Sequence, residues 1–211
     1  MPRTVTTTKE VYKFSELSDS AKERARDWYR EGNLDYDWWD SSFEDFARIA
    51  ELLGISFCQR SVKLMNGSYR SEDSIFFSGF SSQGDGACWE GNYSYRKGSV
   101  KAIKEYAPND TKLHRIAEDL YDIQRRYFYK VSAKATNRGR YYHSGCMSFD
   151  VECDSEQEFK HEQEVIDLLR SFADWMYRQL NDEYDYLNSD ESVDEMIDAN
   201  EYEFSEDGRL A

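Results

Sequence analysis

One cysteine and one histidine could together support nucleophilic chemistry in this sequence. Cys88 follows the bend Gly84-Asp85-Gly86, and His143 lies in a later segment with strand character. A histidine beside a thiol can act as its base, and Asp85 completes this candidate set. The alternative, which we favour, is a buried structural thiol after an ordinary turn, because cysteine is among the most buried residue types. The bend is not a phosphate-binding loop, since no Lys-Ser/Thr pair follows it.

Carboxylates gather in two segments where a hard cation could bind. The first holds Asp35, Asp37 and Asp40, and the second combines residues 190–195 with Glu201 and Glu203. Neither segment has the spacing of an EF-hand loop, and acidic residues before a helix are commonly caps. The four cysteines contain no closely spaced pair of the kind that binds zinc. We therefore predict neither a metal nor another cofactor.

Basic and aromatic residues are interleaved between residues 125 and 142. Base stacking combined with phosphate contacts would use such a mixture. On a strand, however, alternate aromatic residues face the core while the basic residues face solvent. The net charge of −15 also opposes binding to a polyanion. Direct binding of nucleic acid is therefore not expected.

The distribution of negative charge is the feature to which we give most weight. Residues 1–153 carry 23 basic and 23 acidic residues, whereas residues 154–211 carry 4 and 19. A helix rises about 1.5 Å per residue and duplex DNA carries one charge per roughly 1.7 Å, so an acidic helical face can imitate a phosphate track. The alternative is an acidic surface that only keeps the protein solvated. The predicted contact set comprises Glu158, Glu162, Asp167, Asp174, Asp190, Glu191, Asp194 and Glu195.

Hydrophobic periodicity and turn residues predict the elements that must position these groups. Helices are expected over residues 18–32, 41–53, 99–106, from 110 onward, 156–184 and 189–200. Strands are expected over residues 4–12, 55–65, 74–80, 87–95, 127–136 and 141–152, with hairpin turns at 66–67 and 137–140. This order favours an α+β fold with a mostly antiparallel sheet packed by helices on one side. We expect one domain, in which a charge-balanced core (1–153) carries an acidic helical segment (154–211).

The cellular setting follows from what the sequence lacks. It contains no run of 18 apolar residues, and its polar, threonine-rich start does not resemble a signal peptide. Scattered cysteines without a disulfide framework suit a reducing compartment. We therefore expect a cytoplasmic protein with no membrane association.

Four segments resemble a known protein family. They are FSELSDSAKERARDWYREGNLDYDWWD (14–40), FFSGFSSQGDGACWEG (76–91), APNDTKLHR (107–115) and EYDYLNSDESVDEMIDANEYEF (183–204). The family consists of small phage and prophage proteins commonly labelled as antitoxin of a toxin–antitoxin stability system. The resemblance extends over nearly the whole chain, and the segment S-x-Q-G-D-G-A-C is its most specific part. It implies a mobile-element origin, a bacterial host cytoplasm and an accessory role, such as neutralising a toxin or blocking a defence system as an anti-CRISPR protein does.

These observations favour a binding protein over an enzyme. The expected function is stoichiometric neutralisation of a basic, nucleic-acid-handling bacterial protein, with an affinity that falls as salt rises. One alternative is a hydrolase or transferase that uses Cys88 and His143. A second alternative is a protein that binds a nucleotide signal in an aromatic pocket, indicated by the aromatic content of 16%. The sequence leaves the oligomeric state open.

Overall fold

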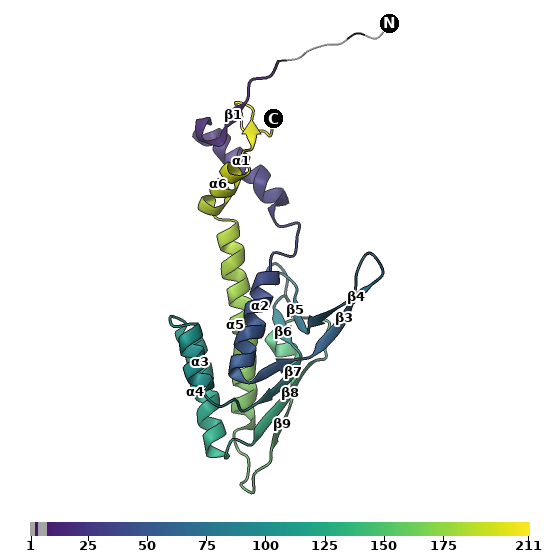
Figure 1. Cartoon of the computed structure of the whole chain (residues 1–211), viewed down its shortest axis with the longest axis vertical. Coiled ribbons are helices and arrows are strands. Elements are labelled where there is room, and N and C mark those ends of the chain that lie inside the picture. The colour runs from purple at the N-terminus through teal and green to yellow at the C-terminus, as the bar shows by residue number, and fades with distance from the viewer. Residues whose placement is uncertain (1–2, 4–7) are drawn as a thin grey trace. The chain divides into compact units, whose positions relative to one another are not determined.

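The computed structural model describes residue 3 and residues 8–211, which form an α+β fold as predicted (Figure 1). The α-helices are α1 (Asp19–Asn33), α2 (Asp40–Leu53), α3 (Ser99–Tyr106), α4 (Thr111–Arg126), α5 (Glu162–Leu187) and α6 (Asp190–Ala199). The strands are β1 (Tyr12–Lys13), β2 (Ile55–Phe57), β3 (Gln59–Lys63), β4 (Tyr69–Asp73), β5 (Ile75–Phe77), β6 (Ala87–Trp89), β7 (Gly91–Ser94), β8 (Val131–Asn137), β9 (Met147–Cys153) and β10 (Glu203–Phe204).

The chain folds into two compact units. Unit 1 combines residues 1–38 with residues 182–211, and unit 2 consists of residues 39–181. The sequence instead suggested a boundary at residue 153, where the charge balance changes. The structure divides the chain elsewhere because compactness follows packing, and α1 packs against α6 although they come from opposite ends of the chain.

Unit 1 has a small core of its own. Strand β1 pairs antiparallel with β10, so that Tyr12 lies opposite Phe204. Serines cap both helices, because the Ser18 hydroxyl accepts from the Ala21 N–H (3.4 Å) and Ser189 does the same at the start of α6. Of the predicted strand 4–12, residues 4–7 lie outside the described residues. The buried residues that form the core are Phe14, Leu17, Ala21, Ala25, Val193, Ile197 and Phe204.

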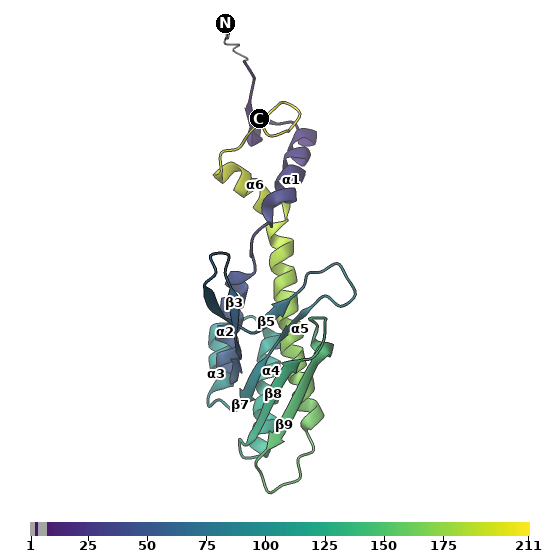
Figure 2. The ribbon, with the colours of Figure 1, turned by 90° about the vertical axis from the view of Figure 1, so that its right-hand side faces the viewer.

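Unit 2 is built on an antiparallel sheet in the order β2-β7-β8-β9 (Figure 2). Two further antiparallel pairs, β3-β4 and β5-β6, complete its strands. Within this unit the helices α2 to α5 lie on one side of the four-stranded sheet. The mostly antiparallel pairing predicted from the sequence is therefore confirmed. The core contains Trp89 of β6 and Phe172 of α5, whose ring centroids lie 6.3 Å apart.

Several boundaries differ from the prediction, and α5 begins at Glu162 instead of residue 156, so that Glu158 precedes the helix. The predicted strand 55–65 is divided into β2 and β3. Strand β4, the hairpin partner of β3, was not predicted because its sequence is polar. Tyr127 ends α4 instead of beginning β8, because Phe128 and Tyr129 adopt left-handed φ angles of 55° and 63°. The turn before β9 is a longer loop with a 3₁₀ turn, Ser144–Cys146. No helix among the described residues combines the length and apolarity that a membrane span requires.

Candidate functional site

Cys88 is a core side chain. It lies on β6 with no exposed surface, and burial raises the pKa of its thiol to about 12, so the thiol is protonated at neutral pH. Among the described residues, no hydrogen bond joins it to His143. Asp85 instead accepts hydrogen bonds from the backbone N–H groups of Ser81 (2.9 Å) and Ser82 (2.7 Å), and such bonds hold its pKa below the usual range. Asp85 therefore stabilises its own loop.

His143 has a different thiol partner. Its Nε2 lies 3.2 Å from Sγ of Cys146, and both residues are half-buried. The Tyr141 ring stacks near the imidazole, with a centroid distance of 6.4 Å. A Cβ on Gly86 would lie 2.7 Å from Cα of His143. Only glycine therefore lets the segment that contains His143 lie so close to the backbone just before β6. The structure thus forms a Cys–His pair, but with Cys146, which follows His143 by three residues in a 3₁₀ turn.

The eight predicted contact acids are divided equally between the two units. Unit 2 holds Glu158 and three residues of α5, and all four are exposed. Glu158 forms an ion pair with Lys160 at 2.9 Å. No described residue forms an ion pair with the other three, which are Glu162, Asp167 and Asp174.

The four predicted contact acids that lie on α6 are not equivalent. Asp194 receives two hydrogen bonds from Arg26, at 2.6 Å from Nε and 2.7 Å from Nη2, and Asp190 bonds Arg30. These contacts attach α6 to α1 inside unit 1. Glu191 and Glu195 are exposed and form no ion pair with any described residue. They therefore remain available to a partner.

The compact units concentrate charge more strongly than the sequence boundary suggested. Unit 1 carries 8 basic and 20 acidic residues, a net charge of −12, whereas unit 2 carries 19 and 22, a net charge of −3. Charge counted along the sequence does not reveal this concentration, because residues 1–38, with 7 basic and 8 acidic residues, are nearly neutral by themselves. Unit 1 is therefore the strongly acidic part of the protein.

Unit 1 also contains an aromatic pocket of about 690 Å³, here called the unit 1 pocket. Trp28 and Tyr202 form one wall, with ring centroids 5.2 Å apart and planes at 83°. Tyr36 is 58% exposed and lies at the pocket surface. The lining residues are Trp28, Tyr29, Glu31, Gly32, Asn33, Tyr36, Met196, Asn200 and Tyr202. Aromatic faces beside a carboxylate suit a cationic group.

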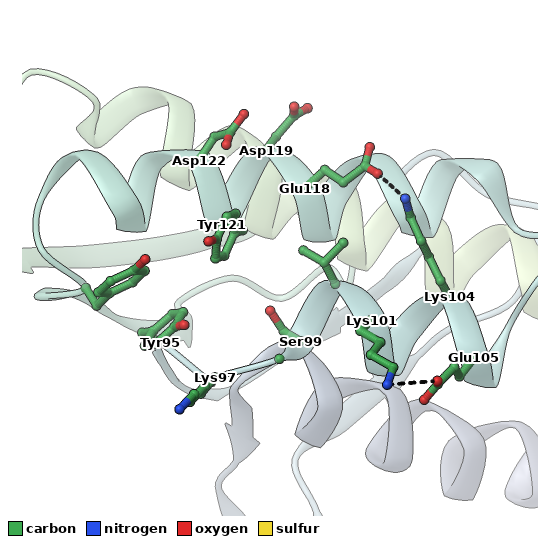
Figure 3. Close-up of a pocket in the computed structure, with 13 residues that line it drawn as sticks. Tyr95, Lys97, Ser99, Lys101, Lys104, Glu105, Glu118, Asp119, Tyr121 and Asp122 are labelled. Atoms are coloured by element: carbon green, nitrogen blue, oxygen red, sulfur yellow. Dashed lines mark ion pairs between the residues drawn. The ribbon is translucent and has the colours of Figure 1, made fainter.

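A larger pocket of about 940 Å³ lies in unit 2 between α3 and α4, here called the α3–α4 pocket (Figure 3). Three tyrosines form one end of it: the rings of Tyr95 and Tyr129 have centroids 4.2 Å apart, and Tyr121 lies 6.2 Å from Tyr129. Elsewhere along the pocket, charges are paired inside the protein, through Lys101–Glu105 (3.5 Å) and Lys104–Glu118 (2.5 Å). The aromatic end of the α3–α4 pocket thus differs chemically from the remainder, where the charged side chains are paired.

The position of Tyr129 depends on a buried side chain. The amide group of Gln124 bonds both backbone groups of Val131, at 2.7 and 3.2 Å, and so sets the start of β8. The backbone N–H of Tyr129 donates to the backbone carbonyl oxygen of Gln124 at 2.7 Å. Closing the chain this tightly forces Tyr129 and its predecessor into left-handed backbone, at a cost of roughly 1–2 kcal/mol for each residue. No sequence signal indicated this turn.

The predicted absence of a metal site is not contradicted. Across residue 3 and residues 8–211, no three side chains of His, Cys, Asp or Glu are grouped so that they could hold a metal ion. Trp38, which follows Asp37 in the sequence, is buried, and this fits a packed corner better than an open loop.

Comparison with known proteins gives one match. No curated protein and no solved structure matches the chain. Residues 38–190 match a protein family described as a domain of unknown function, DUF8835, and this segment includes all of unit 2. Since the match covers well over half of the sequence, the chain belongs to the DUF8835 family.

Proposed function

We propose that this protein is a stoichiometric inhibitor or neutraliser, encoded by a phage or another mobile element. Its target is a basic, nucleic-acid-handling protein of the bacterial cytoplasm, which it binds through unit 1. The observation that carries the proposal is the net charge of −12 on a unit of 68 residues. The resemblance to phage and prophage proteins described above supports the biological setting.

The exposed face of α6 is the proposed centre of the contact. Glu191, Glu195 and Asp198 are exposed and follow one another at spacings of four and three residues, so they share one side of the helix. Carboxylates four residues apart are separated by about 6 Å along the helix axis, close to every second phosphate of one DNA strand. A protein surface that binds phosphates would therefore meet a similar row of charges.

The unit 1 pocket would supply an anchor beside this face. Met196 and Tyr202 line the pocket, and Met196 follows Glu195 directly in α6. Arginine or lysine side chains bind over aromatic rings, and buried arginines are frequent hot spots in protein interfaces. We propose that a basic side chain of the partner enters this pocket. The acidic surroundings would steer the partner toward it over about a Debye length, 8 Å at physiological ionic strength.

The test is capture of partners from bacterial lysate, with nuclease present, by three tagged proteins. The first is the natural sequence. The second carries Glu191→Gln, Glu195→Gln and Asp198→Asn, which remove three charges from unit 1 and keep side-chain size. The matched control carries Glu162→Gln, Asp167→Asn and Asp174→Asn, which remove three charges from unit 2.

The proposal predicts one stoichiometric basic partner that is lost at high salt and with the unit 1 variant, and that is retained by the control. Equal capture by all three proteins, or capture that is unchanged at high salt, would refute the acidic-face mechanism. Loss of capture with the control alone would move the contact to the acids of unit 2.

A second candidate function rests on the contact between His143 and Cys146. In this proposal His143 takes the thiol proton, and the resulting thiolate attacks an acyl carbon of a substrate and displaces its leaving group, which takes the proton back from His143. Water (in a hydrolase) or another nucleophile (in a transferase) then cleaves the thioester and restores the thiol. Reaction of the folded protein with iodoacetamide, followed site by site with mass spectrometry, tests it. Cys146 should react faster than the half-buried Cys58 and Cys153, and His143→Gln should slow it selectively. Equal rates at the three thiols would exclude an activated nucleophile.

A further inference from the structure

The unit 1 pocket presents hydrogen-bond acceptors and no basic side chain. No Lys, Arg or His is among the described residues that line it. The side-chain amide nitrogen of Asn33 donates to the Leu187 carbonyl at 3.3 Å. That of Asn200 donates to the Met196 carbonyl at 2.7 Å. Both amide oxygens thus keep their lone pairs for a donor from outside. The exposed Glu31 carboxylate, which forms no ion pair with any described residue, adds two further acceptor oxygens.

Two helices end at this pocket. Asn33 is the last residue of α1, and Asn200 follows the last residue of α6. The last carbonyl groups of a helix lack intrahelical donors, and the helix dipole places partial negative charge there. Arg30, the basic residue in the last turn of α1, bonds instead to the Asn188 carbonyl (3.0 Å) and to Asp190. The two helix ends therefore strengthen the preference of the pocket for a cation.

The aromatic wall favours one kind of cation over another. Trp28 packs edge to face against Tyr29 and Tyr202, with ring centroids 6.3 and 5.2 Å away. Burial raises the pKa of the Tyr29 phenol, and the nearby phenols of Tyr202 and Tyr36 add to this rise, so the three phenols lie close together. A guanidinium is planar, stacks on aromatic faces and carries five N–H donors, whereas an ammonium is a strongly hydrated point charge with three. Several acceptors beside aromatic rings therefore suit a guanidinium better.

We infer that the unit 1 pocket selects an arginine side chain of the partner over a lysine. The guanidinium lies against the aromatic wall, and its N–H groups bond to the oxygens of Glu31, Asn33 and Asn200. The inference rests on the proposed function, because it names the side chain by which the partner of unit 1 is recognised. The acidic face attracts arginine and lysine alike, so it steers the partner, and the pocket supplies the selection.

NMR titration of the full chain with capped amino acids tests the inference without a partner. The probes, at one ionic strength, are the Nα-acetyl amides of arginine, lysine and citrulline; citrulline has nearly the shape of arginine but no charge. The arginine probe should bind with a dissociation constant of about 1–10 mM, as expected for one isolated side chain, and shift the amide signals of Gly32 and Asn200. The lysine and citrulline probes should bind at least about fivefold more weakly.

Two variants and two matched controls locate the contact. Tyr36→Ala removes a ring that is 58% exposed and should weaken binding of the arginine probe about 2- to 30-fold, the range for one cation–π contact. Glu31→Gln should weaken it about 1.4- to 5-fold. Tyr186 is 56% exposed and Glu206 is exposed, and both belong to unit 1 but lie outside the pocket. Tyr186→Ala and Glu206→Gln should therefore leave the affinity unchanged.

The inference is overturned if the lysine or citrulline probe binds as tightly as the arginine probe. It is equally overturned if the arginine probe does not bind at about 20 mM, or if its affinity survives both Tyr36→Ala and Glu31→Gln. Capture of a basic partner from lysate without arginine selection would overturn the inference and leave the proposed function standing. Selective arginine binding without any captured partner would support the arginine site and count against the proposed function.

Discussion

Truncating one buried side chain in the small core of unit 1 should unfold this unit more readily than the rest of the molecule. Ile197 of α6 has no exposed surface and belongs to the core cluster that also contains residues of α1 and β10. Ile197→Ala removes buried methyl and methylene groups and leaves a cavity, which typically costs about 2–5 kcal/mol. A unit of 68 residues has a total stability of roughly 3–10 kcal/mol. The substitution should therefore remove a large share of the stability of unit 1.

Hydrogen exchange measured by mass spectrometry reports this change unit by unit. Exchange that requires opening of unit 1 should accelerate by about 30- to several thousand-fold in peptides from α1 and α6, since each 1.4 kcal/mol is a factor of ten. Ile197→Val, which costs about 0.5–1.5 kcal/mol, should accelerate the same peptides by only about 2- to 13-fold. Peptides from α3 and α4 should keep their rates in both variants.

Ile103→Ala is the matched control, because Ile103 is equally buried but lies on α3 in unit 2. It should accelerate exchange in unit 2 and leave α6 unchanged. If Ile197→Ala accelerates exchange uniformly along the whole chain, the two units unfold as one, and the reasoning from separate cores is wrong.

Two further substitutions have expected outcomes that follow from local geometry. Gly208→Ala would place a Cβ 2.1 Å from the Ala21 carbonyl oxygen at a φ of +82°, so it should destabilise unit 1 by at least about 2 kcal/mol in urea unfolding. Gly67→Ala, at φ +84° with open space around it, should cost only about 1 kcal/mol. Burial raises the pKa values of Cys88 and Tyr93 to about 12, so above about pH 9 the unfolded chain releases protons that the folded one keeps. The free energy of unfolding should therefore fall between about pH 9 and pH 12, and Cys88→Ala should make that fall shallower; an unchanged pH dependence would contradict the assignment.

Local sequence chemistry predicted most of the helices well. Ser18 caps α1 and Gly54 ends α2 with a left-handed φ of 91°, both as expected from residue type alone. Strand β4, with the sequence YRSED, was missed because it has no apolar alternation and is specified by its partner across the hairpin. Short-range preferences therefore account for helix ends, and long-range pairing accounts for the strands that were missed.

The candidate sites were harder to predict, for reasons that differ between them. The thiol partner of His143 depends on a 3₁₀ turn that brings Cys146 back onto the imidazole, while the more conspicuous Cys88 enters the core. The α3–α4 pocket depends on a left-handed tyrosine, which residue preferences do not foresee. Unit 1 joins residues from both ends of the chain, so its charge could not be summed before the fold was known.

The pairing of β1 with β10 has a consequence for the order in which the protein is synthesised and folded. Residues 39–181 are all made before Phe204, so unit 2 can fold while the chain is still on the ribosome. Tyr12 must wait for Phe204, and α1 for α6, until these later residues have been made. A chain shortened by premature termination near residue 190 would keep the DUF8835 region and expose the apolar side of α1. Unit 1 can therefore form only after residues 182–211 have been made, and the proposed binding surface exists only on copies that include them.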